Sequence, residues 1–277
     1  MIKLLGTLLI FPVWADYISF TQEDLQHVET PEILTLERSA TLNGYGYVFF
    51  IPSPIVQDFI SQPDLEHKKL LEVGAGFSSN AKACLGKGIL QYTVNDLAHE
   101  HLAVLAKQLD RPIPENLKLF CGRCPQDFSK LEETYHSILI DKVLHFLNPE
   151  EIQFFLKWAY DHLEEEGTLY ILTIAPTIPS MPEILPAYQA RALAGEEYPG
   201  YFENITVEKY RASHPQYKIP EMMTFFTLSD LLALVKKFGF EVTKTYSLKL
   251  PSLETPQWGE ADQSALVGVL VRKNQRN

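Results

Sequence analysis

The chain has 277 residues, is 46% hydrophobic and carries a formal net charge of -11. This length and apolar content are enough for one large core, or for a core plus a cap. The acidic balance, with no cluster of Lys and Arg, excludes a basic track for nucleic-acid phosphates. No stretch is long and apolar enough to span a bilayer. Three cysteines, an odd and small number, do not make a disulfide framework.

Residues 1–60 are expected to form an N-terminal segment and a cap ahead of the main domain. The apolar run Leu4 to Trp14 follows a lysine, and Ala15 fits the end of a secretory signal, so cleavage of residues 1–15 is one reading. Because the run is short and contains Pro12, packing of this segment on the domain is the alternative. The aromatic stretch that follows, up to Phe50, fits either the core or a ligand cover.

A strand, a tight turn and a helix start organise the chain around Lys69–Val73, Gly74-Ala-Gly76 and the residues from Asn80 onward. Glycines in such a turn remove the Cβ atoms that would keep a ligand away from the backbone amides. The start of the helix leaves amide N–H groups free, with a partial positive charge behind them. The stretch therefore predicts a site for a ligand with anionic or hydroxyl-rich parts.

Short apolar runs then alternate with helical patterns. Further strands are expected at Leu90–Asn95, Leu117–Cys121, Ser137–Asp141, Thr168–Ile174, Phe240–Tyr246 and Ala265–Val271. Helices are expected at Pro54–Ile60, at Asn80–Leu85, at Glu100–Leu109, from an Asn148 cap to Gly167, and at Leu231–Phe238. This alternation predicts a parallel sheet with helices on both faces, in a main domain that spans residues 61–277.

Residues 175–224 interrupt the alternation. They contain seven prolines and six tyrosine or phenylalanine residues between Tyr188 and Tyr217. Long insertions in a compact domain are usually functional lids or disordered segments, and the aromatic content favours a lid.

Four short motifs resemble those of class I S-adenosylmethionine-dependent methyltransferases. Glu72-x-Gly74-x-Gly76 resembles the first motif of that family, and Asp96 follows at the end of the next strand, where an acid can accept hydrogen bonds from both ribose hydroxyls. The stretch around Asp127 is similar to the family's third motif, and Asp141-Lys-Val-Leu-His to the motif at the fourth strand. Further matches, at Leu163-Glu-Glu-Glu-Gly167 and at Lys237-Phe-Gly239-Phe240, extend the resemblance over most of the chain in the expected order.

The resemblance implies a Rossmann-like α/β fold with a seven-stranded, mostly parallel sheet whose last strand is antiparallel. It also implies S-adenosyl-L-methionine as cofactor, a small-molecule acceptor methylated by in-line displacement, and a cytoplasmic location, with export as the alternative if residues 1–15 are a signal peptide. No metal is expected. The implied cofactor-binding residues are Glu72, Gly74, Ala75, Gly76, Asn95, Asp96, Leu97, Gln126, Asp127, Phe128, Asp141 and Lys142.

Two histidines are candidate general bases, because the reference pKa of histidine is close to neutral. His145 follows the fourth strand and His214 lies in the insertion. The alternative for each is a histidine that hydrogen-bonds within the fold. An acceptor pocket is expected to be walled by aromatic and methionine side chains, which could instead fix the insertion to the core: Tyr45, Tyr47, Tyr188, Tyr201, Met222 and Phe225.

Two other functions compete with this interpretation. A nicotinamide-dependent oxidoreductase on a related fold requires a third glycine, where this chain has Ser79. A non-catalytic binding protein, exported if the N-terminus is cleaved, would have the same fold. The spacing Cys121-x-x-Cys124 is that of a redox pair, but it lacks the strand-to-helix setting of such sites and a second pair of metal ligands, so incidental thiols are the favoured reading.

Overall fold

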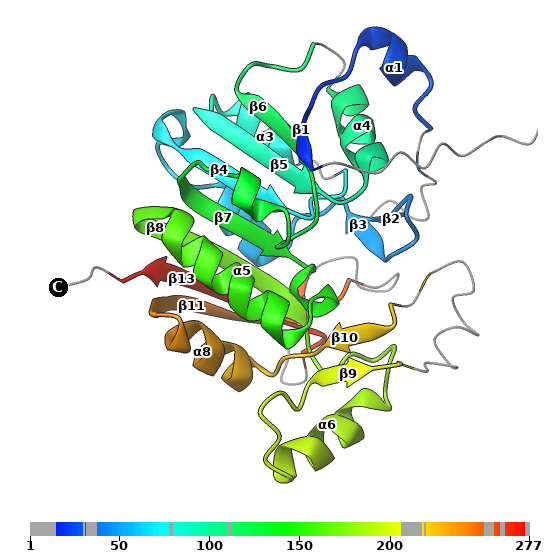
Figure 1. Ribbon diagram of the computed structural model, residues 1–277, viewed down its shortest axis with the longest axis vertical. Helices are drawn as coiled ribbons and strands as arrows, with labels where there is room; N and C mark the ends of the chain where they lie inside the picture. Colours follow the sequence, from blue (N-terminus) through cyan, green and yellow to red (C-terminus); the bar gives the residue numbers. More distant parts are fainter. Residues whose placement is uncertain are drawn as a thin grey trace, which may run out of the picture.

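A nine-stranded sheet forms the centre of the protein in the computed structural model, which describes residues 15–29, 31, 38–77, 80–109, 112–205, 218, 220–251, 258–260 and 264–274 (Figure 1). The strand order is β1-β6-β5-β4-β7-β8-β13-β11-β12. These strands are β1 (Asp16–Ile18), β4 (Lys69–Val73), β5 (Gln91–Asp96), β6 (Leu117–Cys121), β7 (Tyr135–Asp141), β8 (Leu163–Ile174), β11 (Phe240–Lys249), β12 (Gly259–Glu260) and β13 (Leu266–Lys273).

The seven predicted strands form the middle of this sheet. Strands β6, β5, β4, β7 and β8 run parallel, and β13 lies antiparallel between β8 and β11. The mostly parallel fold with an antiparallel last strand is therefore confirmed. The number of strands is larger than predicted, because β1 and β12 add antiparallel pairs at the two edges. Each of these strands has at most three residues, too few to show a period in the sequence.

Helices cover both faces of the sheet. One face packs against α5 (Pro149–His162) and α8 (Leu228–Lys237), which lie in front of the sheet in Figure 1. The other face packs against α2 (Pro54–Ile60), α3 (Asn80–Gly86) and α4 (His99–Gln108). None of the helices in the described ranges is long and apolar enough to cross a membrane.

The strands read as continuous apolar runs because both faces of the sheet are buried. Successive side chains of a strand point to opposite faces. Leu71 and Val73 of β4 therefore join the core on the α5 side, whereas Leu70 joins the core on the α2 side. Glu72 lies two residues after Leu70, so its side chain points to the same face and places a carboxyl group among apolar neighbours.

Capping residues set the starts of two long helices, and the cap at Asn148 was predicted from the sequence. Asn148 caps α5 and Thr227 caps α8, each in a reciprocal capping box with the residue three positions later. The predicted end of α5 at Gly167 is wrong. The helix ends at His162, because Leu163 is already extended and pairs with Tyr135 at the start of β8.

Two additions extend beyond the sheet, and their hairpins lie to its right in Figure 1, at the edge where the parallel strands end. The cap contributes α1 (Gln22–Gln26) and the hairpin β2–β3 (Arg38–Ala40, Tyr47–Phe49). The insertion contributes α6 (Ile184–Leu193) and the hairpin β9–β10 (Tyr201–Glu203, Met222–Thr224). The short helices η1 (Leu65–His67), η2 (Phe128–Lys130) and η3 (Leu144–Phe146) complete the elements.

Loss of the α5 cap should lower stability measurably. In Asn148→Ala the amide of Glu151 loses the side-chain acceptor that lies 2.9 Å away. We expect the free energy of unfolding to fall by about 1 kcal/mol and the Tm to fall by about 2–4 °C, measured by circular dichroism. Ser53→Ala is the matched control, because Ser53 also precedes a helix but its side chain makes no capping hydrogen bond. Equal losses in the two variants would contradict the assigned role of Asn148.

Candidate active site

A cavity of about 510 Å³ opens where β4, β5 and β7 end. Its floor is formed by the residues at and after these strand ends, and its walls come from the cap and the insertion. Small-molecule sites span roughly 300–1,000 Å³ and lie in open α/β sheets at the carboxyl ends of the strands. The cavity thus has the size and the position of a ligand site.

The glycine turn after β4 lines this cavity in a left-handed conformation, with φ of 63° at Gly74 and 60° at Gly76. A Cβ at Gly74 would lie 2.2 Å from the Val143 side chain, and a Cβ at Gly76 would lie 2.8 Å from the Val48 side chain. The amide of Ala75 already donates to the Asn95 carbonyl (3.0 Å). These glycines are therefore required by the backbone conformation and by close packing, rather than by the open amides that the sequence suggested.

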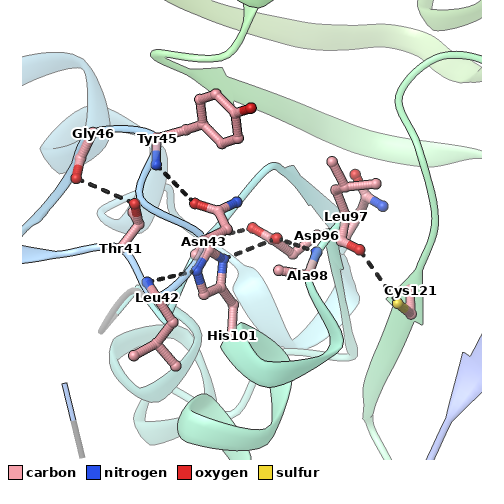
Figure 2. Close-up of polar contacts among 12 residues, drawn as sticks. Thr41, Leu42, Asn43, Tyr45, Gly46, Asp96, Leu97, Ala98, His101 and Cys121 are labelled. Carbon is pink, nitrogen blue, oxygen red and sulfur yellow. Dashed lines mark hydrogen bonds and ion pairs between the residues drawn. The ribbon is translucent and has the colours of Figure 1, made fainter. Parts of the chain in front are cut away.

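Asp96 ties the end of β5 to the glycine turn. Its Oδ2 accepts a hydrogen bond from the Gly76 amide (2.7 Å), and its Oδ1 accepts from the Ala98 amide (2.7 Å) and from the His101 ring (3.0 Å). Figure 2 shows that the other nitrogen of His101 faces the cap, where the Leu42 amide donates to Nε2 (3.1 Å). A backbone amide can only donate, so the proton of neutral His101 lies on Nδ1, toward Asp96. The cap is thus joined to the acid of the turn through one histidine.

Glu72 is a second anchored carboxylate in the cavity wall. It is 2% exposed and accepts hydrogen bonds from the side-chain amide of Asn80 (2.8 Å) and from the Tyr92 phenol (2.7 Å). Burial, and then the charge of Glu72, raise the pKa of Tyr92, which keeps the phenol protonated as a donor. The chain therefore holds this charge in a fixed orientation at the base of the cavity.

The turn after β7 brings an ion pair to the cavity. Asp141 pairs with Lys142, and each side chain is 18% exposed. Lys142 adopts a left-handed φ of 57°, a strained conformation for a residue other than glycine. Its ammonium lies 5.4 Å from the ring centroid of Phe49 and 5.9 Å from that of Trp258. The backbone strain and the ring contacts fix one cation at this end of the cavity.

The structure brings thirteen of the predicted residues to one cavity. The cofactor set contributes Glu72, Gly74, Ala75, Gly76, Asn95, Asp96, Leu97, Gln126, Asp141 and Lys142, and the acceptor set contributes Tyr45, Tyr47 and Met222. Leu97 is 53% exposed beside Asp96, which leaves an apolar surface open at that end. Gln126 donates to Glu151, so its amide already has a partner.

The other five residues of the predicted cofactor and acceptor sets lie outside the cavity lining. Phe128 is fully buried against Trp158 and so cannot cover a ligand ring. Asp127 accepts from the Arg123 amide (2.8 Å) in its own turn. Tyr188 donates to Asp230, Phe225 packs against Phe202, and Tyr201 donates to Glu203 (3.0 Å). Tyr188 and Phe225 thus connect the insertion to the segment that follows it, Tyr201 bonds within the insertion, and none of the three lines the cavity.

His145 is unsuited to the role of a general base. It is 4% exposed, and its Nδ1 has no hydrogen-bond partner within the described part of the chain. Burial, with a smaller contribution from the Lys142 ammonium, lowers its pKa to about 3. A base is most effective when its pKa is near the working pH. His214 lies outside the described residues.

The three cysteines form no disulfide bond, and burial keeps their thiols protonated. Cys84, Cys121 and Cys124 are free, and burial raises the pKa of Cys121 to about 11 and that of Cys84 to about 12. Such thiols form little reactive thiolate. Within the described ranges, no group of three His, Cys, Asp or Glu side chains could hold a metal ion.

His101, Ser53 and Trp258 are among the cavity residues that were not predicted from the sequence. His101 follows Asp96 by five residues, a spacing that a strand end and the first turn of a helix bring together. Ser53 and Trp258 reach the cavity from the cap and from the segment before β12, and their types and spacing carry no signal. The cap and the insertion also meet over the cavity, where the Lys218 amide donates to the Gly44 carbonyl (3.0 Å).

Solved structures share the fold of this chain. A SAM-dependent methyltransferase from Methanosarcina mazei gives a TM-score of 0.54 at 16% identity and covers 80% of this chain and 98% of its own. The chain has the fold of S-adenosylmethionine-dependent methyltransferases. A structure from Listeria monocytogenes, named for the same cofactor, gives 0.54 at 15% identity, with 80% and 99% of the two chains covered. A methyltransferase from Mesorhizobium loti gives 0.52 at 14%, with 79% and 96% covered. No family model matches the sequence, and no curated protein is similar to it.

The buried His145 predicts a specific pH dependence of stability. It stays neutral in the folded protein down to its pKa of about 3, whereas the unfolded chain takes up this proton near the ordinary pKa of 6.5. Between these two pH values only the unfolded state binds the proton. The free energy of unfolding therefore decreases by about 1.4 kcal/mol for each unit by which the pH is lowered. The effect is absent above the unfolded pKa.

Urea unfolding of the wild type and of His145→Gln, which has no titrating ring, tests this expectation. Between about pH 7 and pH 5 the wild type should lose about 2 kcal/mol more than the variant. Parallel pH profiles would show that His145 is accessible to protons in the folded state.

Proposed function

We propose that this protein is an S-adenosylmethionine-dependent methyltransferase with a small-molecule acceptor. The observation that carries the proposal is the contact between Asp96 and the Gly76 amide on the wall of one cavity. This contact places a carboxylate beside the glycine turn, and Asp96 Oδ2, which accepts only from the Gly76 amide, keeps a lone-pair site for a ribose hydroxyl. The fold shared with methyltransferases supports it.

The charge of the cavity favours a cationic cofactor. Five carboxyl groups line it, those of Glu72, Asp96, Asp141, Glu151 and Glu221, against the two cations Arg123 and Lys142 among the described residues. A sulfonium is attracted by such a lining, whereas the diphosphate of a nicotinamide dinucleotide is repelled by it. The same lining weighs against the oxidoreductase alternative.

The positions of the cavity residues, as well as their charges, fit an adenosyl group with an amino-acid end. Asp96 would hold the ribose, and the exposed apolar side chain of Leu97 would pack against the base. Glu72, fixed by Asn80 and Tyr92, would face the amino-acid end. The turn at Gly74 and Gly76 would lie against the part of the cofactor that links the ribose to the amino-acid end.

When bound, adenosylmethionine supplies a methyl group on a sulfonium sulfur, which a nucleophilic acceptor atom displaces in line while the sulfur keeps the electron pair of the broken bond. The chain has then mainly to align the partners and to exclude water. Tyr45 and Phe146 pack edge to face across the top of the cavity at 6.4 Å between centroids, and Lys218 joins the insertion to the cap there. This roof supports the role of the insertion as a lid and favours acceptors small enough to lie beneath it.

Binding of S-adenosylhomocysteine, the demethylated cofactor, tests the proposal directly. In titration calorimetry the wild type should bind it and should bind NAD at least about 100-fold more weakly. Asp96→Ala should weaken S-adenosylhomocysteine binding by about 10-fold or more, because hydrogen bonds to a charged group contribute about 1.5–3 kcal/mol.

Asp161→Ala is the control, because Asp161 pairs with Lys157 in an exposed ion pair on α5. Its affinity for S-adenosylhomocysteine should equal that of the wild type. The proposal fails if the wild type ignores S-adenosylhomocysteine, or if it binds NAD equally well.

A further inference from the structure

The end of the cavity opposite Asp96 contains polar groups that the proposed function leaves unused. Ser53 is 2% exposed and lines the cavity, yet its hydroxyl has no hydrogen-bond partner within the described part of the chain. It precedes α2 without capping it. A buried polar atom without a partner costs free energy, so this hydroxyl calls for a physical reason.

Aromatic and apolar side chains surround these groups. The Lys142 ammonium lies near the rings of Phe49 and Trp258, which are 5.4 Å apart between centroids. The indole N–H of Trp258 donates to the Ile51 carbonyl (2.9 Å), which fixes the ring on the cavity wall. The result is a subsite with flat apolar walls, one ammonium and one unpaired hydroxyl.

The order of the strands places this subsite away from the nucleoside. Asp96 lies at the end of β5, on one side of β4, whereas Lys142 follows β7, on the other side. The Lys142 amide donates to the Leu172 carbonyl of β8 (2.8 Å), and α2, which follows Ser53, packs on β7, β8 and β13. Strands lie about 4.8 Å apart, so the subsite is centred two or more strand spacings beyond Asp96.

We propose that this subsite binds the methyl acceptor, and that the acceptor is a small organic acid with a planar apolar body. Its carboxylate pairs with Lys142 and accepts from the Ser53 hydroxyl, and its body lies against Phe49 and Trp258. This inference rests on the proposed function, because the adenosyl group must occupy the Asp96 end for the acceptor to lie beyond β4. Lys142 then determines specificity, and Asp141 holds its ammonium in position.

Cinnamate and cinnamamide are suitable probes, because they share a planar apolar body and differ in charge. Each is titrated by ligand-observed NMR into protein saturated with S-adenosylhomocysteine. The wild type should bind cinnamate about 10-fold more tightly than cinnamamide. Lys142→Met should remove this preference by weakening cinnamate alone, and Lys142→Arg should restore most of it. Phe49→Leu should weaken both probes.

Lys244→Met is the matched control. Lys244 also pairs with a carboxylate, that of Asp58, and lies 5.0 Å from the ring centroid of Tyr246, but it is outside the cavity. This variant should keep the preference for cinnamate. Circular dichroism confirms that each variant is folded.

The cofactor also has a carboxylate, at its amino-acid end, that could pair with Lys142. A second measurement distinguishes this pairing from binding of the acceptor. S-adenosylhomocysteine and 5′-methylthioadenosine, which lacks the amino-acid end, should each bind Lys142→Met as they bind the wild type. Selective loss of S-adenosylhomocysteine binding would assign Lys142 to the cofactor and overturn the inference. So would equal affinities of the wild type for the two probes, or no binding of cinnamate. A wild type that does not bind S-adenosylhomocysteine contradicts the proposed function itself.

Discussion

The hydrogen bond between Asp96 and the Gly76 amide fixes the relation between two neighbouring strands at the point where both end. Parallel pairing of β4 and β5 brings their carboxyl ends to one edge, and this bond sets the turn of one strand against the acid of the other. Both groups are buried, so water does not compete for the bond. The glycine turn, the start of α4 and the attachment of the cap all depend on the orientation of this one carboxylate.

His101 extends that constraint to the cap. It binds Asp96 through one ring nitrogen and accepts the Leu42 amide through the other, so the loop that carries Tyr45 is held relative to the floor of the cavity (Figure 2). Protonation of Nε2 would remove the acceptor for Leu42, whereas a neutral ring satisfies both partners. The position of the roof is therefore coupled to the same residues that would contact a ribose.

The sequence predicted the strands that show clear patterns and missed those that are too short to show one. Strands β4 and β6 have the predicted bounds because both faces are buried and charged or turn residues flank them. Within the site, Asp96 and Gly76 could be predicted to meet because carboxyl ends of parallel strands share an edge. Phe128 and His145 could not be placed, because each lies in a single turn of 3₁₀ helix, where sequence spacing does not reveal which side faces the core. Ser53 and Trp258 reach the cavity only through tertiary packing.

The ion pair after β7 allows one cavity to bind a cationic sulfonium and an anionic acceptor. An isolated ammonium close to a sulfonium would be repelled by about 4 kcal/mol at 4 Å and an effective dielectric constant of 20. Asp141 offsets that repulsion because it holds the opposite charge against Lys142, and the rings of Phe49 and Trp258 stabilise the cation on its other side. The pair is neutral toward a cofactor at the β4–β5 end, but its ammonium keeps two donors for an anion that arrives from the cap side. A cavity that is acidic as a whole can thus favour a cation at one end and a carboxylate at the other.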